Sequence, residues 1–431
     1  MSEHGVSEQP ASRLRNIIGG SAGNLVEWFD WYVYSAFTLY FAPSFFPKGD
    51  QTAQLLSSAA VFAVGFVMRP IGAWLMGMYA DRKGRKAGLT LSVSLMCGGS
   101  LMIAAAPTYA NIGLLSPAIL VLARIIQGLS LGGEYGSSAT YLSEMAGRAR
   151  RGFWSSFQYV TLIAGQLVAL ALLLLLQATL GEAALEAWGW RIAFAVGGLL
   201  AIVVFFIRRR LTETASFKAV KLDEARKTSS ATALFREHPR EALLVMALTA
   251  GGTLAFYAYT TYMQKYLANT VGFDRVTASR IMTLALFLFM VLQPLGGLLS
   301  DRVGRKPVMI AFGVAGTLLT VPIFLALEQT RDPATAFALV LGSLVIVTGY
   351  TSINAVVKAE LFPAHIRALG VALPYAIANT LFGGTAEYVA LWLKGAGHER
   401  YFYYYVAATI GLSLIAYIMM RDTRDHSLIS D

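Results

Sequence analysis

The sequence contains the same short motif twice, each time directly after a long apolar run. The first copy is Gly77-Met-Tyr-Ala-Asp81-Arg82-Lys-Gly84-Arg85-Lys86, and the second is Gly297-Leu-Leu-Ser-Asp301-Arg302-Val-Gly304-Arg305-Lys306. The two Asp residues are 220 positions apart (301 − 81). The glycine after the Asp-Arg pair, Gly84 in the first copy, provides a tight turn, so the motif predicts a short charged connection between two helices.

A second motif repeats at nearly the same distance. Glu144 precedes Arg151 by seven residues, and Glu360 precedes Arg367 by seven residues. These copies are 216 positions apart (360 − 144). Two motif pairs with nearly equal offsets indicate a duplicated unit of about half the chain.

The composition indicates whether this duplicated unit lies in water or in a membrane. The chain has 431 residues, of which 56% are apolar and 14% are charged. A typical soluble domain is about 25% charged. The mean hydropathy is +0.56, which excludes a soluble globular protein. The single cysteine and the 24 Phe, 20 Tyr and 7 Trp exclude a disulfide-stapled or disordered chain. The chain is therefore expected to be a polytopic membrane protein.

Windows of about 20 apolar residues predict twelve membrane-spanning helices. The windows are continuously apolar without strict alternation, which favours helices over a β-barrel. The predicted spans are 17–42, 54–80, 87–106, 117–142, 153–177, 190–207, 241–267, 277–299, 308–327, 334–357, 367–393 and 401–420. The predicted fold is all-α, with two pseudo-symmetric six-helix bundles. The predicted parts are an N-terminal tail (1–16), a first bundle (17–207), a linker (208–240), a second bundle (241–420) and a C-terminal tail (421–431).

The distribution of Lys and Arg orients the predicted bundle. The chain has 35 of these residues and a net charge of +10. Two lie deep inside spans (Arg69 and Arg124), eight lie toward one side, and the remaining 25 lie toward the side that carries both termini. Cytoplasmic loops collect Lys and Arg, so both termini are expected to be cytoplasmic. The positive charge is thus topological and gives no reason to expect a nucleic-acid partner.

Three stretches in the first half place the chain in a family. They are Gly23-Asn24-Leu-Val-Glu27-Trp28-Phe-Asp30-Trp-Tyr32-Val-Tyr34, Arg69-Pro70-Ile-Gly72 and Arg124-Ile-Ile-Gln127-Gly128-Leu-Ser130-Leu-Gly132-Gly133-Glu134-Tyr135. With the repeated loop motif, the chain resembles the major facilitator superfamily, and within it the metabolite:proton symporters. The similarity is greatest to members that carry alpha-ketoglutarate. The resemblance implies two halves that rock about a midplane site.

Five ionisable residues stand out within the predicted spans, namely Glu27, Asp30, Arg69, Arg124 and Glu134. Each costs at least about 2.5–3.5 kcal/mol mid-span unless it is paired or faces water. They therefore mark either a functional site or a structural network of ion pairs.

The resemblance gives these charges roles. Asp30 is expected to carry the proton and to pair with Arg124, with Glu27 and Glu134 as further proton-coupling candidates. We favour a gating or structural role for Glu134. Arg69 and Arg124 are expected to hold the two carboxylates of a dicarboxylate, because two guanidinium groups match two anionic groups. The alternative is that Arg69 pairs with Glu27 as scaffold.

Further candidates are polar groups within or next to the spans. Lys265 lies near the outer end of its span, where it either snorkels or attracts an anion. The other substrate-binding candidates are Gln158, Tyr159, Tyr262, Asn354, Tyr375 and Asn379. The repeated motifs are expected to form a cytoplasmic gate from Asp81, Arg85, Glu144, Arg151, Asp301, Arg305, Glu360 and Arg367.

The sequence thus predicts a proton-coupled symporter that imports alpha-ketoglutarate or a similar dicarboxylate through the bacterial inner membrane. The alternatives are a symporter of the same family for citrate, another carboxylate or a zwitterion such as betaine. An enzyme is less favoured, because the five histidines are scattered, and a channel is less favoured because buried opposite charges suit a carrier. We expect no cofactor, no metal, a monomer in the lipid bilayer, and a small anionic metabolite and protons as partners.

Overall fold

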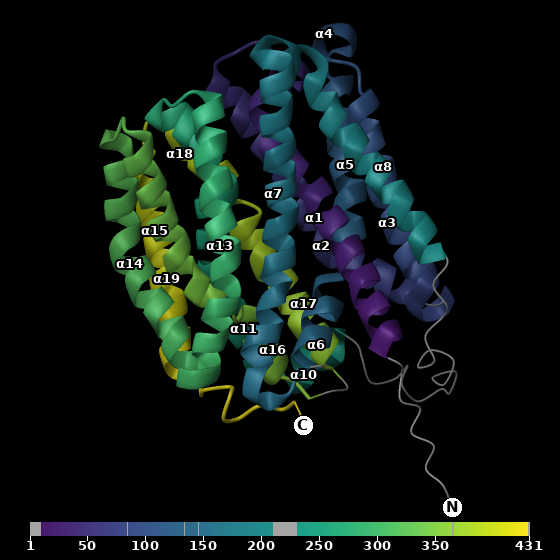
Figure 1. Cartoon of the computed structure of the whole chain (residues 1–431), viewed down its shortest axis with the longest axis vertical. Coiled ribbons are helices and arrows are strands. Elements are labelled where there is room, and N and C mark those ends of the chain that lie inside the picture. The colour runs from purple at the N-terminus through teal and green to yellow at the C-terminus, as the bar shows by residue number, and fades with distance from the viewer. Residues whose placement is uncertain are drawn as a thin grey trace, which may run out of the picture.

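The computed structural model describes residues 10–83, 85–132, 134–144, 146–209, 231–363 and 366–429. Within these ranges every regular element is a helix. Figure 1 shows the helices running roughly along the long axis of the molecule, with the first half of the chain on one side and the second half on the other. The predicted all-helical fold is confirmed. Most of the predicted linker and of the predicted N-terminal tail lies outside the described residues.

The first half begins with long helices that cover the first predicted windows and extend beyond them. Helix α1 already begins at Pro10, inside the predicted tail. The helices of this half are α1 (Pro10–Phe45), α2 (Gln51–Lys83), α3 (Arg85–Ala105), α4 (Tyr109–Ile112), α5 (Leu115–Leu131), α6 (Glu134–Glu144), α7 (Arg151–Ala184) and α8 (Trp190–Arg209), with short turns η1 (Arg148–Arg150) and η2 (Leu185–Gly189).

The second half repeats this pattern with more interruptions. Three of its turns have the wider π-helical geometry, which often marks functional sites. Its elements are α10 (Ala231–Glu237), α11 (Pro239–Tyr257), η3 (Ala258–Tyr262), α12 (Met263–Tyr266), η4 (Leu267–Val271), α13 (Arg275–Val303), α14 (Arg305–Gln329), α15 (Pro333–Thr351), α16 (Asn354–Glu360), α17 (Arg367–Ala378), η5 (Asn379–Gly383), α18 (Ala386–Gly395) and α19 (Arg400–Met419).

Three predicted windows are broken rather than continuous. Window 117–142 is divided into α5 and α6, window 334–357 into α15 and α16, and window 367–393 into α17, η5 and α18. At the second break the Thr348 carbonyl accepts hydrogen bonds from both the hydroxyl and the backbone N–H of Ser352, at 2.7 and 3.1 Å. Apolar periodicity does not reveal such breaks, because both pieces remain apolar.

The break between α5 and α6 accompanies an unusually close approach of two helices. A Cβ on Gly128 would lie 2.2 Å from the carbonyl oxygen of Gly65, and one on Gly132 would lie 2.1 Å from that of Arg69. Only glycine allows α5 to contact α2 backbone to backbone at these positions. This contact places Arg69 and Arg124 on adjacent helices.

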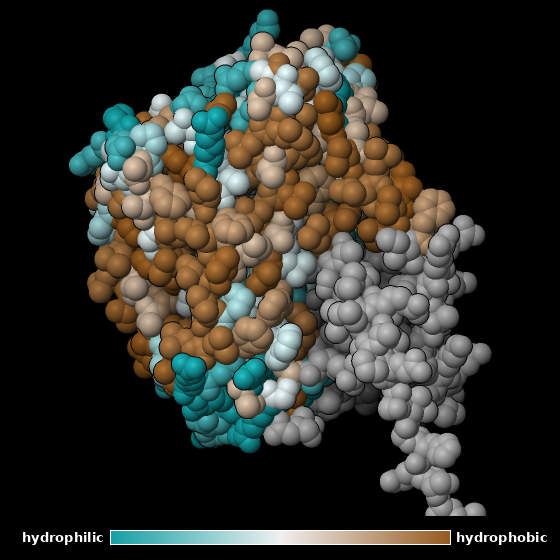
Figure 2. All heavy atoms as spheres, in the orientation of Figure 1, coloured by the Kyte–Doolittle hydropathy of each residue, from teal (hydrophilic) through white to brown (hydrophobic). Residues whose placement is uncertain are grey.

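The surface of the molecule is suited to lipid. Figure 2 shows a broad hydrophobic region across the middle of the visible face, with hydrophilic residues gathered at both ends. Exposed apolar side chains on α13 and α14 include Leu284, Leu288 and Leu318. Seven helical stretches in the described part of the chain are long and apolar enough to cross a membrane by length and composition.

The two halves meet along several helices. Helix α7 packs along α13, α2 packs against α18, and α6 contacts α16 and α17. We call the end of the molecule that carries Asp301 and Glu360 the gate end, and the end that carries Glu387 the opposite end. The candidate site lies between these two ends.

Candidate functional site

Asp30 lies at the centre of a hydrogen-bond network within the first half. Its side chain is fully buried on α1. One carboxylate oxygen accepts a hydrogen bond from the Ser100 hydroxyl of α3. The other accepts from Gln127 Nε2 of α5 at 2.8 Å, and the same amide nitrogen lies 2.9 Å from Ser100 Oγ. Side chains from two other helices, α3 and α5, therefore hold this carboxylate of α1.

Gln127 connects Asp30 to Arg124. Arg124 Nη1 donates to Gln127 Oε1 at 2.8 Å, and both side chains are fully buried. Among the described residues no ion pair joins Asp30 and Arg124 directly. The structure thus connects the two predicted partners through Gln127. The Gln127 amide accepts a hydrogen bond from Arg124 and donates one to Asp30.

Arg69 and Arg124 share an aromatic neighbour. The guanidinium carbons of Arg124 and Arg69 lie 3.9 Å and 4.1 Å from the centre of the Trp31 ring. Arg69 also lies 4.1 Å from the Phe66 ring, and Arg124 lies 4.6 Å from the Tyr34 ring. Such cation–π contacts contribute about 2 kcal/mol or more when desolvated, but they do not satisfy N–H donors.

Both arginines have unused donors. The Nε and Nη2 atoms of Arg69 and of Arg124 are buried, and none of them has a hydrogen-bond partner among the described residues. The Arg69 side chain is 5% exposed and that of Arg124 is 0% exposed. Buried unsatisfied donors on two cations are costly, so this is a place where an anion would bind favourably.

The other predicted proton-coupling residues are less informative. Glu27 is buried on α1, and no ion pair between Glu27 and Arg69 occurs among the described residues. The scaffold pairing of these two therefore receives no support. The side chain of Glu134 lies outside the described residues.

Tyrosines and one lysine fill the space between the halves near the gate end. Tyr135 of α6 stacks on Tyr375 of α17, with ring centres 3.9 Å apart. The Tyr135 hydroxyl donates to Asn354 Oδ1 at 2.9 Å, and Lys358 Nζ donates to the same oxygen at 2.8 Å. Tyr159 of α7 lies against Tyr375 and Asn354. The predicted candidates Tyr159, Asn354 and Tyr375 are thus neighbours.

The structure corrects the predicted position of Lys358, which is buried and does not lie in a loop. The predicted span 334–357 ends one residue before Lys358, which placed this lysine among the cations of a cytoplasmic loop. Helix α16 instead continues to Glu360, and Lys358 is 0% exposed. The physical reason is that the short helix turns its whole surface inward, since all of its residues are buried.

An ion pair joins the predicted candidate Lys265 to a residue not selected from the sequence. Lys265 Nζ lies 2.8 Å from Glu387 Oε2 and donates to Ser35 Oγ at 2.8 Å. Lys265 is 1% exposed, so it does not snorkel to a surface. Because Ser35 belongs to α1, this cluster also connects the halves.

The remaining candidates are buried but separate. Gln158 is buried on α7. Tyr262 packs edge-on against Phe402, and Asn379 accepts a hydrogen bond from Thr253. The contacts of Tyr262 and Asn379 lie within the second half, which gives them an interhelical role in this conformation.

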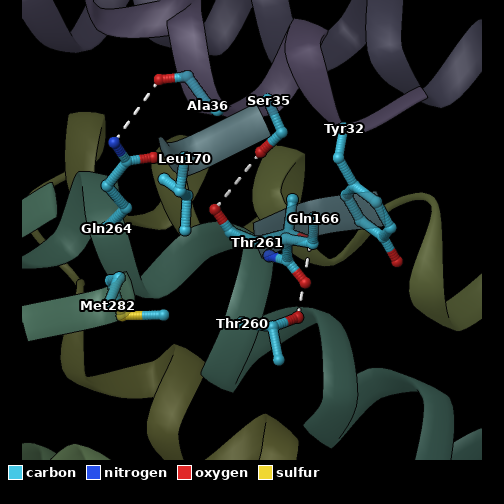
Figure 3. A pocket seen from close by; sticks show the side chains of 9 residues that line it. All are labelled: Tyr32, Ser35, Ala36, Gln166, Leu170, Thr260, Thr261, Gln264 and Met282. Atoms are coloured by element: carbon cyan, nitrogen blue, oxygen red, sulfur yellow. Dashed lines mark hydrogen bonds between the residues drawn. The ribbon is translucent and has the colours of Figure 1, made fainter. Parts of the chain in front are cut away.

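A small pocket lies between the halves, close to Lys265. It is far smaller than the roughly 300–1,000 Å³ usual for ligand pockets. Figure 3 shows Ser35 and Ala36 of α1 facing Thr261 and Gln264 of the second half. Ser35 Oγ lies 3.4 Å from the Thr261 carbonyl oxygen, and Gln264 Nε2 donates to the Ala36 carbonyl at 3.4 Å. The pocket is lined by Tyr32, Ser35, Ala36, Gln166, Leu170, Thr260, Thr261, Gln264 and Met282.

The repeated motifs meet at the gate end. Asp301 accepts hydrogen bonds from the backbone N–H groups of Gly152 and Phe153 at 2.8 and 2.9 Å, and from Arg305 at 2.7 Å. The N-terminus of α7 thus receives a carboxylate from the other half, which its dipole favours. The side chains of Asp81 and Arg85 lie outside the described residues.

Each Arg of the second motif pairs with the Glu of the other half. Arg151 pairs with Glu360 at 3.8 Å, and Arg367 pairs with Glu144 at 2.5 Å. Glu360 also lies 3.6 Å from Arg305. Arg151, Arg305 and Glu360 are at most 2% exposed. These contacts close the gate end, and the Lys265 cluster connects the halves toward the opposite end, so neither end of the described structure is open.

We expect Glu360→Gln to open the gate end more often. The change removes the Glu360 charge that faces Arg151 and leaves Arg305 with Asp301 alone, and breaking a buried pair costs about 3–5 kcal/mol. In a Cys97→Ser background, a cysteine replacing the buried Ser155 should react several times faster with an impermeant maleimide applied from the gate side.

Glu399→Gln is the matched control for this experiment, because Glu399 pairs with Lys394 toward the opposite end. It should leave the reaction rate at position 155 unchanged. Equal or slower labelling of the Glu360→Gln protein would contradict the assignment of these pairs as a gate.

Sequence reasoning missed four residues of the site. Gln127 lies three positions after Arg124 on the same helix face, a spacing that could have revealed it. Glu387 is a charge within a predicted span and meets the criterion used for the other five. Lys358 lies one residue beyond a predicted boundary. Nothing in the sequence distinguishes Ser100 from other serines in spans.

Taken together, a duplicated helical bundle with buried charges at the interface of its halves defines a membrane carrier of small solutes. The family model of the Major Facilitator Superfamily matches residues 21–386 and 254–429. The chain belongs to the major facilitator superfamily. It is a transporter rather than an enzyme, and a multi-pass protein of the bacterial inner membrane.

Individual relatives agree with this family. The chain is 53% identical to the alpha-ketoglutarate permease of Escherichia coli (strain K12) over 414 residues, covering 96% of this chain and 95% of that protein. This confirms the resemblance found in the motifs. It is 31% identical to the citrate-proton symporter of Salmonella typhi, covering 99% and 98%. Among solved structures, the proton:xylose symporter XylE of E. coli has a TM-score of 0.77 at 19% identity, covering 97% and 98%, which shows the fold alone.

Proposed function

We propose that this chain is a proton-coupled symporter that imports alpha-ketoglutarate or a similar dicarboxylate. The observation that carries the proposal is the arginine pair, Arg69 and Arg124, whose buried donors lack partners and whose second member is connected through Gln127 to Asp30. Guanidinium groups pair with carboxylates in a planar, bidentate manner, so two of them with free donors favour an anionic, carboxylate-bearing substrate. The names of the permease and citrate symporter relatives agree with this chemistry.

Gln127 relays the protonation state of Asp30 to Arg124. When Asp30 is ionised, its oxygen accepts from the Gln127 amide nitrogen and orients the amide oxygen toward Arg124. When Asp30 is protonated, it no longer needs that donor, and Gln127 can rotate away. Arg124 is then free to bind a substrate carboxylate. Loss of the proton restores the relay and weakens the hold on the substrate.

The movement that carries the substrate is rocking of the two halves. The paired contacts at the gate end open in one state, and the Lys265 cluster opens in the other. We assign twelve membrane spans to the helices of the predicted windows, with both termini in the cytoplasm and the gate end facing it. The proton gradient supplies the energy for transport, and no cofactor takes part. The protein acts as a monomer in the bilayer.

Uptake into proteoliposomes tests this function. We expect labelled alpha-ketoglutarate to accumulate above the external concentration only when the outside is more acidic than the inside. Unlabelled alpha-ketoglutarate should compete fully, and betaine should not compete. Citrate tests the alternative that the chain is a citrate symporter. If citrate competes at lower concentration than alpha-ketoglutarate, the substrate is a tricarboxylate. Uptake that ignores the pH gradient would overturn the coupling.

A further inference from the structure

Lys358 is a buried cation without an ionic partner. It is 0% exposed, and no Asp or Glu lies within ion-pair distance of it among the described residues. Its ammonium donates to Asn354 Oδ1 at 2.8 Å and lies 3.5 Å from the Tyr135 hydroxyl. An ammonium has three donors, so at least one is left for another acceptor.

The surroundings of Lys358 stabilise its charge only in part. Its Nζ lies 4.0 Å from the Tyr375 ring centre, 5.5 Å from that of Tyr135 and 5.8 Å from that of Tyr350. Contacts of this kind contribute about 0.5–2 kcal/mol, whereas burying an ion costs several kcal/mol. The three tyrosines therefore offset only part of the cost of burying the Lys358 charge, and an anion bound beside Lys358 would lower the free energy further.

The position of Lys358 suits an anion shared between the halves. Lys358, Asn354 and Tyr375 belong to the second half, whereas Tyr135 belongs to the first. Helix α17, which carries Tyr375, packs against α16, which carries Lys358, and against α2, which carries Arg69. Helix α17 thus connects the helices that carry the lysine of one half and the arginine of the other.

We propose that Lys358 binds one carboxylate of the transported dicarboxylate while the Arg69 and Arg124 guanidinium groups of the opposite half together bind the other. This assignment rests on the proposed function and adds the substrate contact of the second half. A bound dicarboxylate then connects the two halves, and each half holds one carboxylate. A monocarboxylate of the same length can satisfy only one of them, so Lys358 selects for the second charge.

A selectivity ratio tests this assignment. Lys358→Gln removes the charge but keeps a donor for Asn354 Oδ1. In proteoliposomes, unlabelled alpha-ketoglutarate and 2-oxopentanoate, which lacks the second carboxylate, are compared as inhibitors of labelled alpha-ketoglutarate uptake. We expect Lys358→Gln to raise the KM for alpha-ketoglutarate about tenfold or more. The ratio of the two inhibitory concentrations should fall by a similar factor.

A structural role gives a different result. If Lys358 only supports the fold, or is uncharged during transport, the KM or the transport rate can change but the ratio stays at the wild-type value, and the proposal is overturned. Lys358→Arg, which keeps the charge, should retain most of the ratio. Lys358→Met provides the same test should Lys358→Gln fail to fold. Lys48→Met, at an exposed position, is the control for loss of a lysine.

The outcome also separates this proposal from the one on which it depends. If the wild-type protein shows no uptake of alpha-ketoglutarate under a pH gradient, the proposed function fails. If the wild type transports alpha-ketoglutarate and prefers it to 2-oxopentanoate, but Lys358→Gln retains that preference, only the role of Lys358 fails.

Discussion

Replacing Asp30 by Asn abolishes the accumulation of substrate against a gradient while substrate exchange continues. Asparagine has nearly the shape of a protonated aspartic acid but cannot load or release a proton. Its amide oxygen can still accept a hydrogen bond from Gln127 or Ser100, which hold Asp30 in the wild type. We expect the ratio of internal to external alpha-ketoglutarate to fall to about one under an imposed pH gradient.

Counterflow measures the exchange that remains. Proteoliposomes loaded with unlabelled substrate should still take up labelled substrate through the Asp30→Asn protein. Asp50→Asn is the matched control, because Asp50 is an exposed residue that accepts a hydrogen bond from the Ala53 backbone at the start of α2, and Asn serves equally well there. Accumulation by the Asp30→Asn protein would show that another group carries the proton.

Replacing Arg69 or Arg124 by Lys impairs substrate binding strongly although the charge is kept. Lysine offers a point charge and cannot present the planar fork that pairs with a carboxylate in a bidentate manner. A hydrogen bond to a charged group contributes about 1.5–3 kcal/mol, which corresponds to a KM increase of about 10–150-fold. The stacked contacts with Trp31 are weakened in the same variants.

The scaffold hypothesis predicts a different pattern for these lysine variants. A charge that only neutralises a neighbour tolerates lysine, so the KM would change little and any loss would be in the amount of folded protein. Size-exclusion profiles in detergent separate the two effects. Arg280→Lys, at an exposed position on α13, should leave uptake unchanged.

The sequence predicts most of the fold because the membrane imposes a strong physical constraint on it. A bilayer of fixed thickness requires apolar windows of fixed length, and the helices of the structure begin and end close to the predicted positions. The exceptions are informative. One predicted span is divided next to Ser352, and Lys358 stays inside because the short helix that follows is buried along its whole length.

The candidate site was less accessible to sequence reasoning. Asp30, Arg69 and Arg124 stand out because charges are rare in spans, and the structure brings them to one region. Gln127 and Ser100 are uncharged, so only the folded arrangement reveals that they hold Asp30. A sequence shows that a charge is buried, but not which neutral groups solvate it.

The gate shows a similar limit. Each Glu and Arg of the repeated motif is seven residues from its partner in the chain, which leaves open which Glu meets which Arg. The structure pairs Arg151 with Glu360 and Arg367 with Glu144. Pseudo-symmetry between the halves explains this exchange, because equivalent residues face each other across the interface.

Proton movement driven by substrate is the most direct test of the central claim, which is that Asp30 carries a proton together with the dicarboxylate. Proteoliposomes contain a pH-sensitive dye and have their membrane potential clamped, and alpha-ketoglutarate is added outside. The account predicts rapid internal acidification with the wild-type protein and none with Asp30→Asn. Substrate entry through the wild type without acidification, or acidification that persists in Asp30→Asn, would contradict it.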